Sequence, residues 1–182
     1  MKINPRHIFV PLLFACLVAM LSGCSTLKHS VKNKKKGKAK TEKIDKHRRH
    51  EIEKNLHGDV KLIIDEALEW MGTPYEFGRQ DKGVATDCSG FVMRVFEKAG
   101  YKLPRNSAKQ AEFCSPVKKG GVKAGDLVFF ITNGGTKINH VGLMIDDDQF
   151  IHASTKGVVI SSMSSNYYST HFQLYGRVPG LK

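Results

Sequence analysis

The residue best suited to covalent chemistry in this chain of 182 residues is Cys88, within the segment 86–92 that reads TDCSGFV. Apolar residues recur at helical spacing from Phe91 to Ala99 and Gly100 ends the run, which predicts a helix that begins at the cysteine. The unpaired N–H groups and the positive dipole end of a helix start favour the thiolate, which is the nucleophilic form. The alternative is that Cys88 is a small buried hydrophobic residue, as most free cysteines are.

Two of the eight histidines, His140 and His152, fall inside segments that read as strands. His140 would share a strand face with Gly142, whose missing side chain leaves room beside the imidazole. Nucleophilic catalysis needs a thiolate, a base that takes and returns a proton, and a group that orients the base. Cys88, His140 and His152 could fill these roles in that order, because neighbouring antiparallel strands would place the two rings side by side.

A metal site is an alternative use of the same residues. Zinc could be bound by Cys88, His140 and His152 together with Cys114. No Cys-x-x-Cys or His-x-x-x-His spacing supports this, and the sequence has no glycine-rich phosphate loop, so we expect no metal and no cofactor. The two cysteines could instead pair under oxidising conditions, but only if their Cα atoms lie within about 7 Å.

The order of the expected elements predicts an α+β fold. Apolar residues at helical spacing predict a helix from residue 58 or 59 to 71, and a short helix is expected at 107–113. Short apolar or alternating runs then predict strands at 127–131, 140–145, 150–154, 158–162 and 174–178. The short links between them imply hairpins, so we expect N-terminal helices packed on a small antiparallel sheet of about five or six strands.

Residues 1–23 read as an export signal. An apolar run at 10–21 follows two basic residues and is too short to span a bilayer comfortably. The run ends in Leu-Ser-Gly-Cys, which resembles the bacterial lipoprotein signal and implies that Cys24 is diacylated and becomes the mature N-terminus. The acyl chains would anchor the protein stably, and Ser25 favours the outer membrane, facing the periplasm. The alternative is a soluble exported protein with an incidental cysteine.

Most of the formal net charge of +12 lies next to this signal. Residues 25–55 hold twelve Lys or Arg and four Asp or Glu, and this composition predicts a flexible linker at 24–57 ahead of a domain at 58–182. A basic run can bind nucleic acid, but an exported lipoprotein rarely meets any. We therefore expect either contact with anionic lipid or cell-wall carboxylates, or only a solvated tether.

Six stretches of the domain resemble the NlpC-type papain-like cell-wall cysteine peptidases. They are GTPY at 72–75, DCSGFV at 87–92, LPR at 103–105, GDLVFF at 125–130, HVG at 140–142 and FIHAST at 150–155. The resemblance covers roughly residues 60–178, essentially the whole domain. Asp-Cys-Ser-Gly alone is moderately specific, but the match is strong once both histidine segments follow in order behind a lipoprotein signal.

The resemblance implies a papain-like core and a Cys-His-His mechanism. Cys88 would be the nucleophile, His140 the general base and acid, and His152 the third polar member. Tyr75 matches the family tyrosine whose hydroxyl lies near the nucleophile, and it would help the backbone N–H of Cys88 to stabilise the oxyanion.

The same resemblance implies that Asp87 and Ser89 line the substrate groove and that the substrate is the peptide stem of peptidoglycan. Family members hydrolyse amide bonds that involve D-Glu and diaminopimelate, or diaminopimelate cross-links. This chain has Gly78-Arg79 where the family often has Gly-Gly, in a loop expected to border the groove, so the bond cleaved stays open. The alternatives are a non-catalytic peptidoglycan-binding lipoprotein and a related cysteine acyltransferase or amidase.

Overall fold

The computed structural model describes residues 56–182. The export signal at 1–23, the acylated Cys24 and almost all of the basic linker lie outside the described residues, so they stay predictions. Within the described part of the chain, no helix is both long and apolar enough to cross a membrane.

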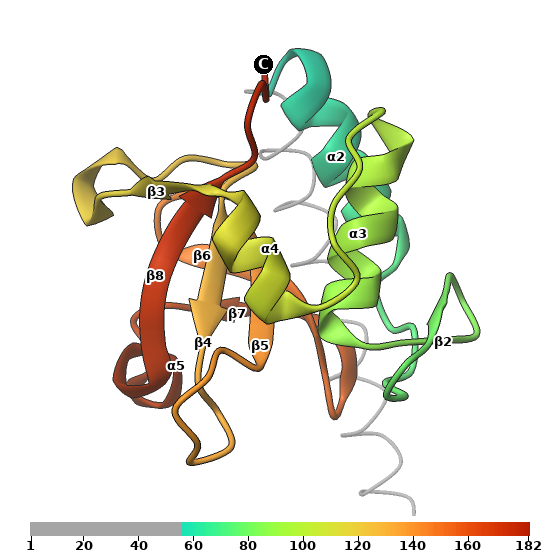
Figure 1. Cartoon of the computed structure of the whole chain (residues 1–182). Coiled ribbons are helices and arrows are strands. Elements are labelled where there is room, and N and C mark those ends of the chain that lie inside the picture. The colour runs from blue at the N-terminus through green and yellow to red at the C-terminus, as the bar shows by residue number, and fades with distance from the viewer. Residues whose placement is uncertain (1–55) are drawn as a thin grey trace, which may run out of the picture. The chain divides into compact units, whose positions relative to one another are not determined.

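Three helices come before most of the sheet, as the sequence predicts: α2 (Gly58–Glu69), α3 (Cys88–Lys98) and α4 (Ser107–Phe113). Helix α2 buries four residues at helical spacing on the face that it turns to the core. Helix α3 begins at Cys88, and Gly100 follows its end with a φ of 87°, a left-handed conformation that glycine adopts without strain. Figure 1 shows α2 and α3 lying side by side on one side of the sheet.

The main sheet has six strands in the order β3-β8-β4-β5-β6-β7. Their bounds are β3 (Ser115–Val117), β4 (Leu127–Phe130), β5 (His140–Met144), β6 (Gln149–Ser154), β7 (Gly157–Ser162) and β8 (Phe172–Arg177). Every pair of neighbours in it is antiparallel. The predicted α+β class and antiparallel sheet are therefore confirmed.

Four short elements were not expected from the sequence: β1 (Gln80–Asp81), β2 (Ala85–Thr86), the 3-10 turn η1 (Lys119–Gly121) and α5 (Asn166–His171). The edge strand β3 was also not expected. These segments are short and lack an apolar period, so tertiary contacts decide their conformation. As a result β8, the last strand that the sequence predicts, lies between β3 and β4 and is not an edge strand.

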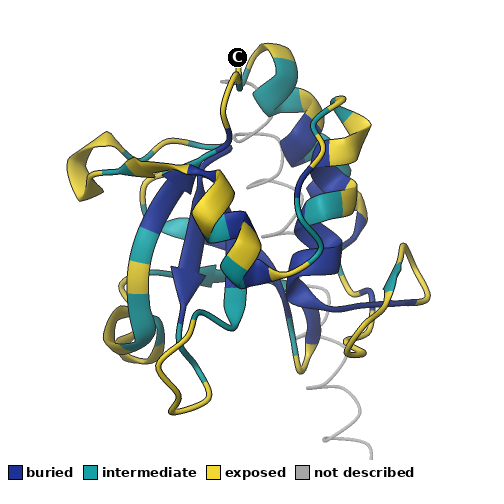
Figure 2. Cartoon of the chain, viewed as in Figure 1, coloured by how far each residue is buried: buried dark blue, intermediate teal, exposed yellow. Residues whose placement is uncertain are grey.

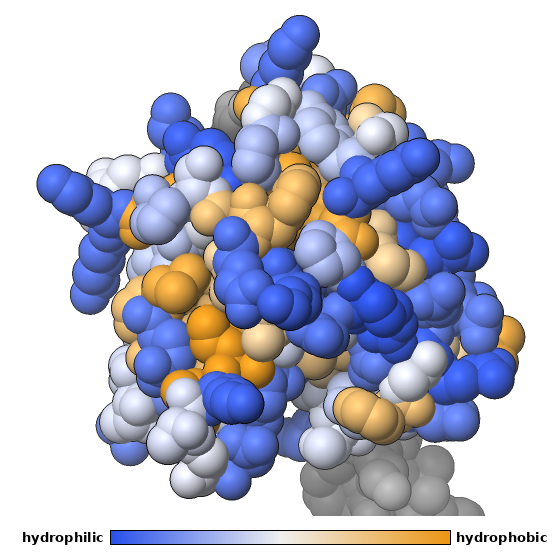
Figure 3. Space-filling view, viewed as in Figure 1, coloured by the Kyte–Doolittle hydropathy of each residue, from blue (hydrophilic) through white to orange (hydrophobic). Residues whose placement is uncertain are grey.

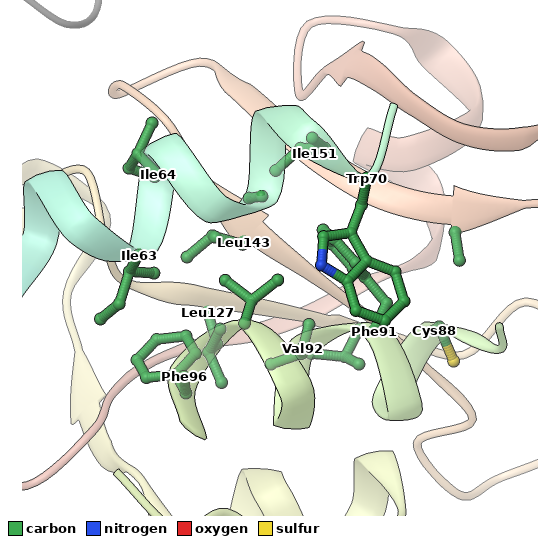
Figure 4. Packing of buried hydrophobic residues seen from close by; sticks show 14 of the residues in the cluster. Ile63, Ile64, Trp70, Cys88, Phe91, Val92, Phe96, Leu127, Leu143 and Ile151 are labelled. Carbon is green, nitrogen blue, oxygen red and sulfur yellow. The ribbon is translucent and has the colours of Figure 1, made fainter. Parts of the chain in front are cut away.

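Both faces of the sheet are covered, and the strands are mostly buried (Figure 2). On one face, side chains of α2, α3 and the strands meet in one cluster that includes Ile63, Phe91 and Leu143 (Figure 4). The second cluster contains Phe130 and Phe150, which come from the opposite face of β4 and β6. The view in Figure 3 is largely hydrophilic, with smaller hydrophobic areas between the polar side chains.

Gly142, in the middle of β5, is the position where the sheet is least tolerant of a side chain. A Cβ there would lie 2.5 Å from Cδ2 of Phe150, a ring whose centroid is 4.9 Å from that of His152. The room left by Gly142 is therefore filled by Phe150, which packs against the second histidine.

We expect Gly142→Ala to lower the free energy of unfolding by about 1–3 kcal/mol, because the added methyl group overpacks this contact. The measurement is urea unfolding at neutral pH. Gly120→Ala is the matched control, since a Cβ at Gly120 meets no atom within 4 Å. Equal loss of stability in the two variants would contradict the claim that Phe150 fills the space left by Gly142.

Candidate active site

The nucleophile candidate is held at the first turn of α3 by its neighbours in the sequence. Asp87 is the N-cap, and its Oδ1 accepts a hydrogen bond of 2.7 Å from the backbone N–H of Gly90. A Cβ at Gly90 would lie 2.5 Å from the carbonyl oxygen of Arg79, so only glycine lets the backbone just before β1 approach the helix this closely. The Asp-Cys-Ser-Gly pattern is therefore explained by a capping carboxylate and a close backbone contact on either side of Cys88.

The Asp87 carboxylate is almost fully buried and is paired with Arg105. The two guanidinium nitrogens Nη1 and Nη2 donate to Oδ1 and Oδ2 at 2.9 and 2.7 Å, which is the strong bidentate geometry. Although burial alone raises the pKa of Asp87, the bonds from Arg105, Gly90 and Gly78 hold that pKa below its ordinary value of 3.8. Asp87 is thus ionised at neutral pH and fixes the loop that precedes the nucleophile.

The same carboxylate fixes the loop that carries Tyr75. Oδ2 of Asp87 accepts a bond from the N–H of Gly78, and the N–H of Arg79 bonds to the carbonyl of Glu76, closing a tight turn. Gly78 has a φ of 83° at the third position of this turn, where glycine is favoured. Arg79 itself pairs with Asp81, so the residue that departs from the family pattern is tied to the hairpin β1–β2.

His140 and His152 are joined directly. Nε2 of His140 lies 2.8 Å from Nδ1 of His152, and the two rings stand nearly perpendicular at 85° with centroids 5.0 Å apart. The histidines come from β5 and β6, whose antiparallel register brings them to the same face. The sequence prediction that neighbouring strands bring the two rings side by side is confirmed.

The thiol of Cys88 lies against the start of β5, beside His140. Its Sγ is 3.8 Å from the carbonyl oxygen of Asn139, and the N–H of Val141 also reaches it. Burial raises the pKa of Cys88 to about 11, while backbone N–H groups of Val141, Ser89 and Cys88 act to lower it. The N–H groups at the helix start therefore lower the pKa of Cys88 as expected, but burial raises that pKa by more in the substrate-free site.

Burial acts on the histidines as well. It lowers the pKa of His140 to about 4, and burial followed by the nearby His140 lowers the pKa of His152 to about 3. At pH 7 the substrate-free site thus holds a neutral thiol and two neutral imidazoles. An unprotonated imidazole is the form that can take a proton from a thiol. The thiolate and the imidazolium that result would then stabilise each other as an ion pair.

A pocket of about 310 Å³ opens beside the histidine pair. Tyr75, His140 and His152 line it, together with Thr132, Asn139 and residues of α5. Burial raises the pKa of Tyr75, followed by the effects of Cys88 and Asp87, so its hydroxyl lies within electrostatic reach of the thiol. The location agrees with the oxyanion role predicted for Tyr75, which stays a prediction.

Asp87 and Ser89, predicted to line the groove, are both buried, and neither is among the residues that line the pocket. The Ser89 hydroxyl lies 3.3 Å from Oδ1 of Asp87 and 3.1 Å from Nη1 of Arg105. The structure gives both residues a positioning role in this network, and their contact with substrate stays a prediction.

Sequence reasoning missed several residues of the site. Arg105 lies in a stretch that matches the family, but it was given no role. Its contact with Asp87 is hidden in the sequence because 18 residues separate the two. Asn139 holds the loop beside the pocket, because its Oδ1 accepts from the N–H of Thr132 at 2.7 Å. Ser161 and Tyr168 both contact His152, and no local pattern signals them.

The structure does not support the zinc alternative. Among residues 56–182, no group of three His, Cys, Asp or Glu is placed to hold a metal ion. Cys114 packs against Gly176 of β8, and both it and Cys88 are free thiols. A larger hollow of about 560 Å³ lies between α2, α3 and β1, but no cysteine, serine or histidine is among its lining residues. Lys82, at its edge, pairs with Glu66 at 2.8 Å and with Glu69 at 2.5 Å.

The fold and the site together define a papain-like cysteine peptidase domain. The chain belongs to the NlpC/P60 family, whose model matches residues 72–177. The solved structure of a protein similar to an NLP/P60 family lipoprotein from Staphylococcus aureus has a TM-score of 0.62 and 35% sequence identity. That match covers 66% of this chain and 41% of the other.

Two curated relatives are similar in sequence. One is named "Probable endopeptidase", from Haemophilus influenzae, and is 39% identical over 121 residues, which cover 65% of this chain and 74% of the relative. The other is named "Murein DD-endopeptidase MepS/Murein LD-carboxypeptidase", from Escherichia coli K12. It is 42% identical over 123 residues, which cover 66% of this chain and 64% of the relative.

We expect Arg105→Met to lower the free energy of unfolding at pH 7 by about 1–3 kcal/mol, because it leaves the Asp87 carboxylate buried and unpaired. The depressed pKa of Asp87 stabilises the wild type above its ordinary value of 3.8, and that stability is lost as the pH falls through the folded-state pKa. The gap between variant and wild type should therefore shrink in urea unfolding below pH 3.8.

Arg94→Met is the matched control, since the Arg94–Glu97 pair is exposed on both sides and surface pairs contribute about 1 kcal/mol or less. A gap for Arg105→Met that stays constant down to pH 2 would contradict the role given to Asp87.

Proposed function

We propose that this chain is a peptidoglycan endopeptidase, a cysteine peptidase that hydrolyses an amide bond in the stem peptide or in a cross-link between stems. The observation that carries the proposal is the 2.8 Å contact between His140 and His152, next to a buried thiol at a helix start. The names of the two curated relatives, both endopeptidases, and the membership of the NlpC/P60 family support it.

The reaction would begin with proton transfer from the Cys88 thiol to His140. The thiolate then attacks the carbonyl carbon, and the backbone N–H of Cys88 with the Tyr75 hydroxyl stabilises the resulting oxyanion. His140 returns the proton to the leaving amine, which leaves a thioester on Cys88. A water molecule, deprotonated by His140, hydrolyses this thioester and restores the thiol. His152 orients His140 throughout.

The lining of the pocket determines which interactions a bound substrate can make. Apart from the neutral histidines, its lining consists of hydroxyl, amide and small side chains, with no carboxylate or basic side chain among them. Arg79 and Lys82, two basic residues of the loop between Tyr75 and Cys88, are both paired with carboxylates of the domain. Substrate recognition at the pocket would therefore rest on hydrogen bonds and shape.

We expect Cys88→Ala to bind purified sacculi while releasing no soluble fragments, because the groove stays intact but the nucleophile is lost. His140→Ala should reduce release by at least about 100-fold, the usual contribution of a general base. The measurement is the release of stem peptides followed by chromatography. Cys114→Ala is the control and should retain activity, since Cys114 lies against β8 rather than at the pocket. Full release by Cys88→Ala would exclude Cys88 as the nucleophile and contradict the proposal, whereas a wild type that binds sacculi but releases no fragments would leave a non-catalytic binder.

We also propose that the protein is a lipoprotein of the outer membrane, held by acylated Cys24 and facing the periplasm. The Leu-Ser-Gly-Cys end of the signal and the following Ser25 support this location. The basic linker would then lie between the membrane and the wall, where anionic lipid or wall carboxylates are its expected contacts.

We expect the full chain, expressed in a Gram-negative cell, to incorporate labelled palmitate and to fractionate with the outer membrane. Cys24→Ala should lose both the label and the membrane association, whereas Cys16→Ala, a change inside the signal, should keep both. An unlabelled, soluble wild-type protein would instead support the alternative of an exported protein with an incidental cysteine.

A further inference from the structure

The pocket beside the histidine pair extends away from the nucleophile. His140 and His152 line it, whereas Cys88 is not among its lining residues. Cys88 belongs to the apolar cluster between the helices and the sheet, while Tyr168 of α5, which also lines the pocket, packs against the second cluster on the other face. The pocket therefore leads from the catalytic histidines to α5.

This direction indicates which half of a substrate the pocket would hold. In the proposed reaction the carbonyl carbon bonds to Cys88, and the leaving nitrogen takes its proton from His140. The leaving nitrogen must then lie within hydrogen-bonding reach of His140. A pocket that is lined by His140 but not by Cys88 would thus receive the residue attached to this nitrogen, which is the amine side of the cleaved bond.

Tyr167 is the most exposed aromatic residue of the pocket lining, with 49% of its surface accessible. Its ring packs against His171 with centroids 4.5 Å apart and stands edge-on to Tyr168 at 5.1 Å. Because two neighbours already hold the ring, little conformational freedom would be lost when a ligand packs on it. A tyrosine presented in this way offers a large contact area at a low entropic cost.

The polar groups of the lining divide into those that are already bonded and those that are not. Thr132 and Asn139 bond to each other, and the Ser154 hydroxyl donates to the carbonyl of Gly157. Three lining hydroxyls have no hydrogen-bond partner in the part of the chain that the structure describes: those of Tyr75, Thr155 and Tyr167. Each can donate and accept, so these three groups are available to a ligand.

The lining also limits the charge of what can bind. It contains no carboxylate and no Lys or Arg side chain, and burial keeps both of its histidines neutral. A carboxylate or ammonium group placed in the pocket would lose hydration without gaining a counter-ion. An aromatic wall with unpaired hydroxyls is instead suited to an uncharged, partly apolar group.

We propose that Tyr167 is a specificity-determining residue whose ring and hydroxyl bind an uncharged part of the residue on the amine side of the cleaved bond. The inference rests on the proposed function, because the amine side has a meaning only if Cys88 forms an acyl-enzyme. Tyr167 packs on Tyr168 and His171 rather than on Cys88 or His140, so it would act by holding the leaving group.

The test compares two substrates that form the same thioester on Cys88. One is a synthetic peptide that contains the bond identified in digests of sacculi, and the other is the methyl ester of the acyl half of that peptide. Attack by the thiolate expels the amine-side residue from the first and methanol from the second, and His140 protonates the leaving atom in both. Methanol is too small to reach from His140 to α5.

We expect Tyr167→Ala to lower kcat/KM for the peptide about five- to thirtyfold, as is usual when an aromatic anchor is truncated. The same variant should leave kcat/KM for the methyl ester within about twofold of wild type, because binding lost with a remote group affects only substrates that carry that group. Tyr167→Phe keeps the ring and should recover part of the loss. Phe113→Ala is the matched control, since Phe113 is 42% exposed and lies outside the pocket lining.

The outcomes separate this inference from the proposed function. Equal losses for the two substrates in Tyr167→Ala would mean that the ring only supports the fold around His152 through Tyr168, and would overturn the inference. An unchanged kcat/KM for the peptide in that variant would overturn it as well. A wild type that hydrolyses neither substrate would overturn the proposed function, and the leaving-group role of Tyr167 with it.

Discussion

The site depends on the register between β5 and β6, because that register alone brings His140 and His152 within hydrogen-bonding distance. A slip of one residue would turn one ring to the opposite face of the sheet, against α3, and would break the pair. Several contacts protect the register. Phe150 occupies the space that Gly142 leaves, the second apolar cluster packs behind the histidines, and β7 continues the ladder with six paired residues.

The nucleophile and the base reach the pocket from different layers of the fold. Cys88 belongs to the cluster between the helices and the sheet, whereas both histidines share a face with the second cluster. They meet at the start of β5, where the thiol contacts the backbone on either side of His140. Burial at this junction keeps all three groups neutral before substrate binds, so charge develops only when the thiol gives up its proton.

The three main helices and the five longer strands could be predicted from apolar periodicity, and so could the helix start at Cys88 and the histidine pair, because each depends on local pattern. The support around them could not. Arg105, Ser161 and Tyr168 act through contacts between different elements of the fold, and α5 is too short and polar to show a helical period. The sequence predicted that the helix start lowers the pKa of Cys88. The burial of Cys88, which raises that pKa by more, depends on tertiary packing and could not be predicted.

The central claim is that Cys88, aligned with His140 and His152, hydrolyses an amide bond of the peptidoglycan stem. Its most direct test is mass spectrometry of the fragments released from purified sacculi in heavy-oxygen water. The account predicts a new amine and a new carboxylate at one defined bond, with a single heavy oxygen in that carboxylate. Stems that stay intact, or an acyl group transferred to another amine without heavy oxygen, would contradict it.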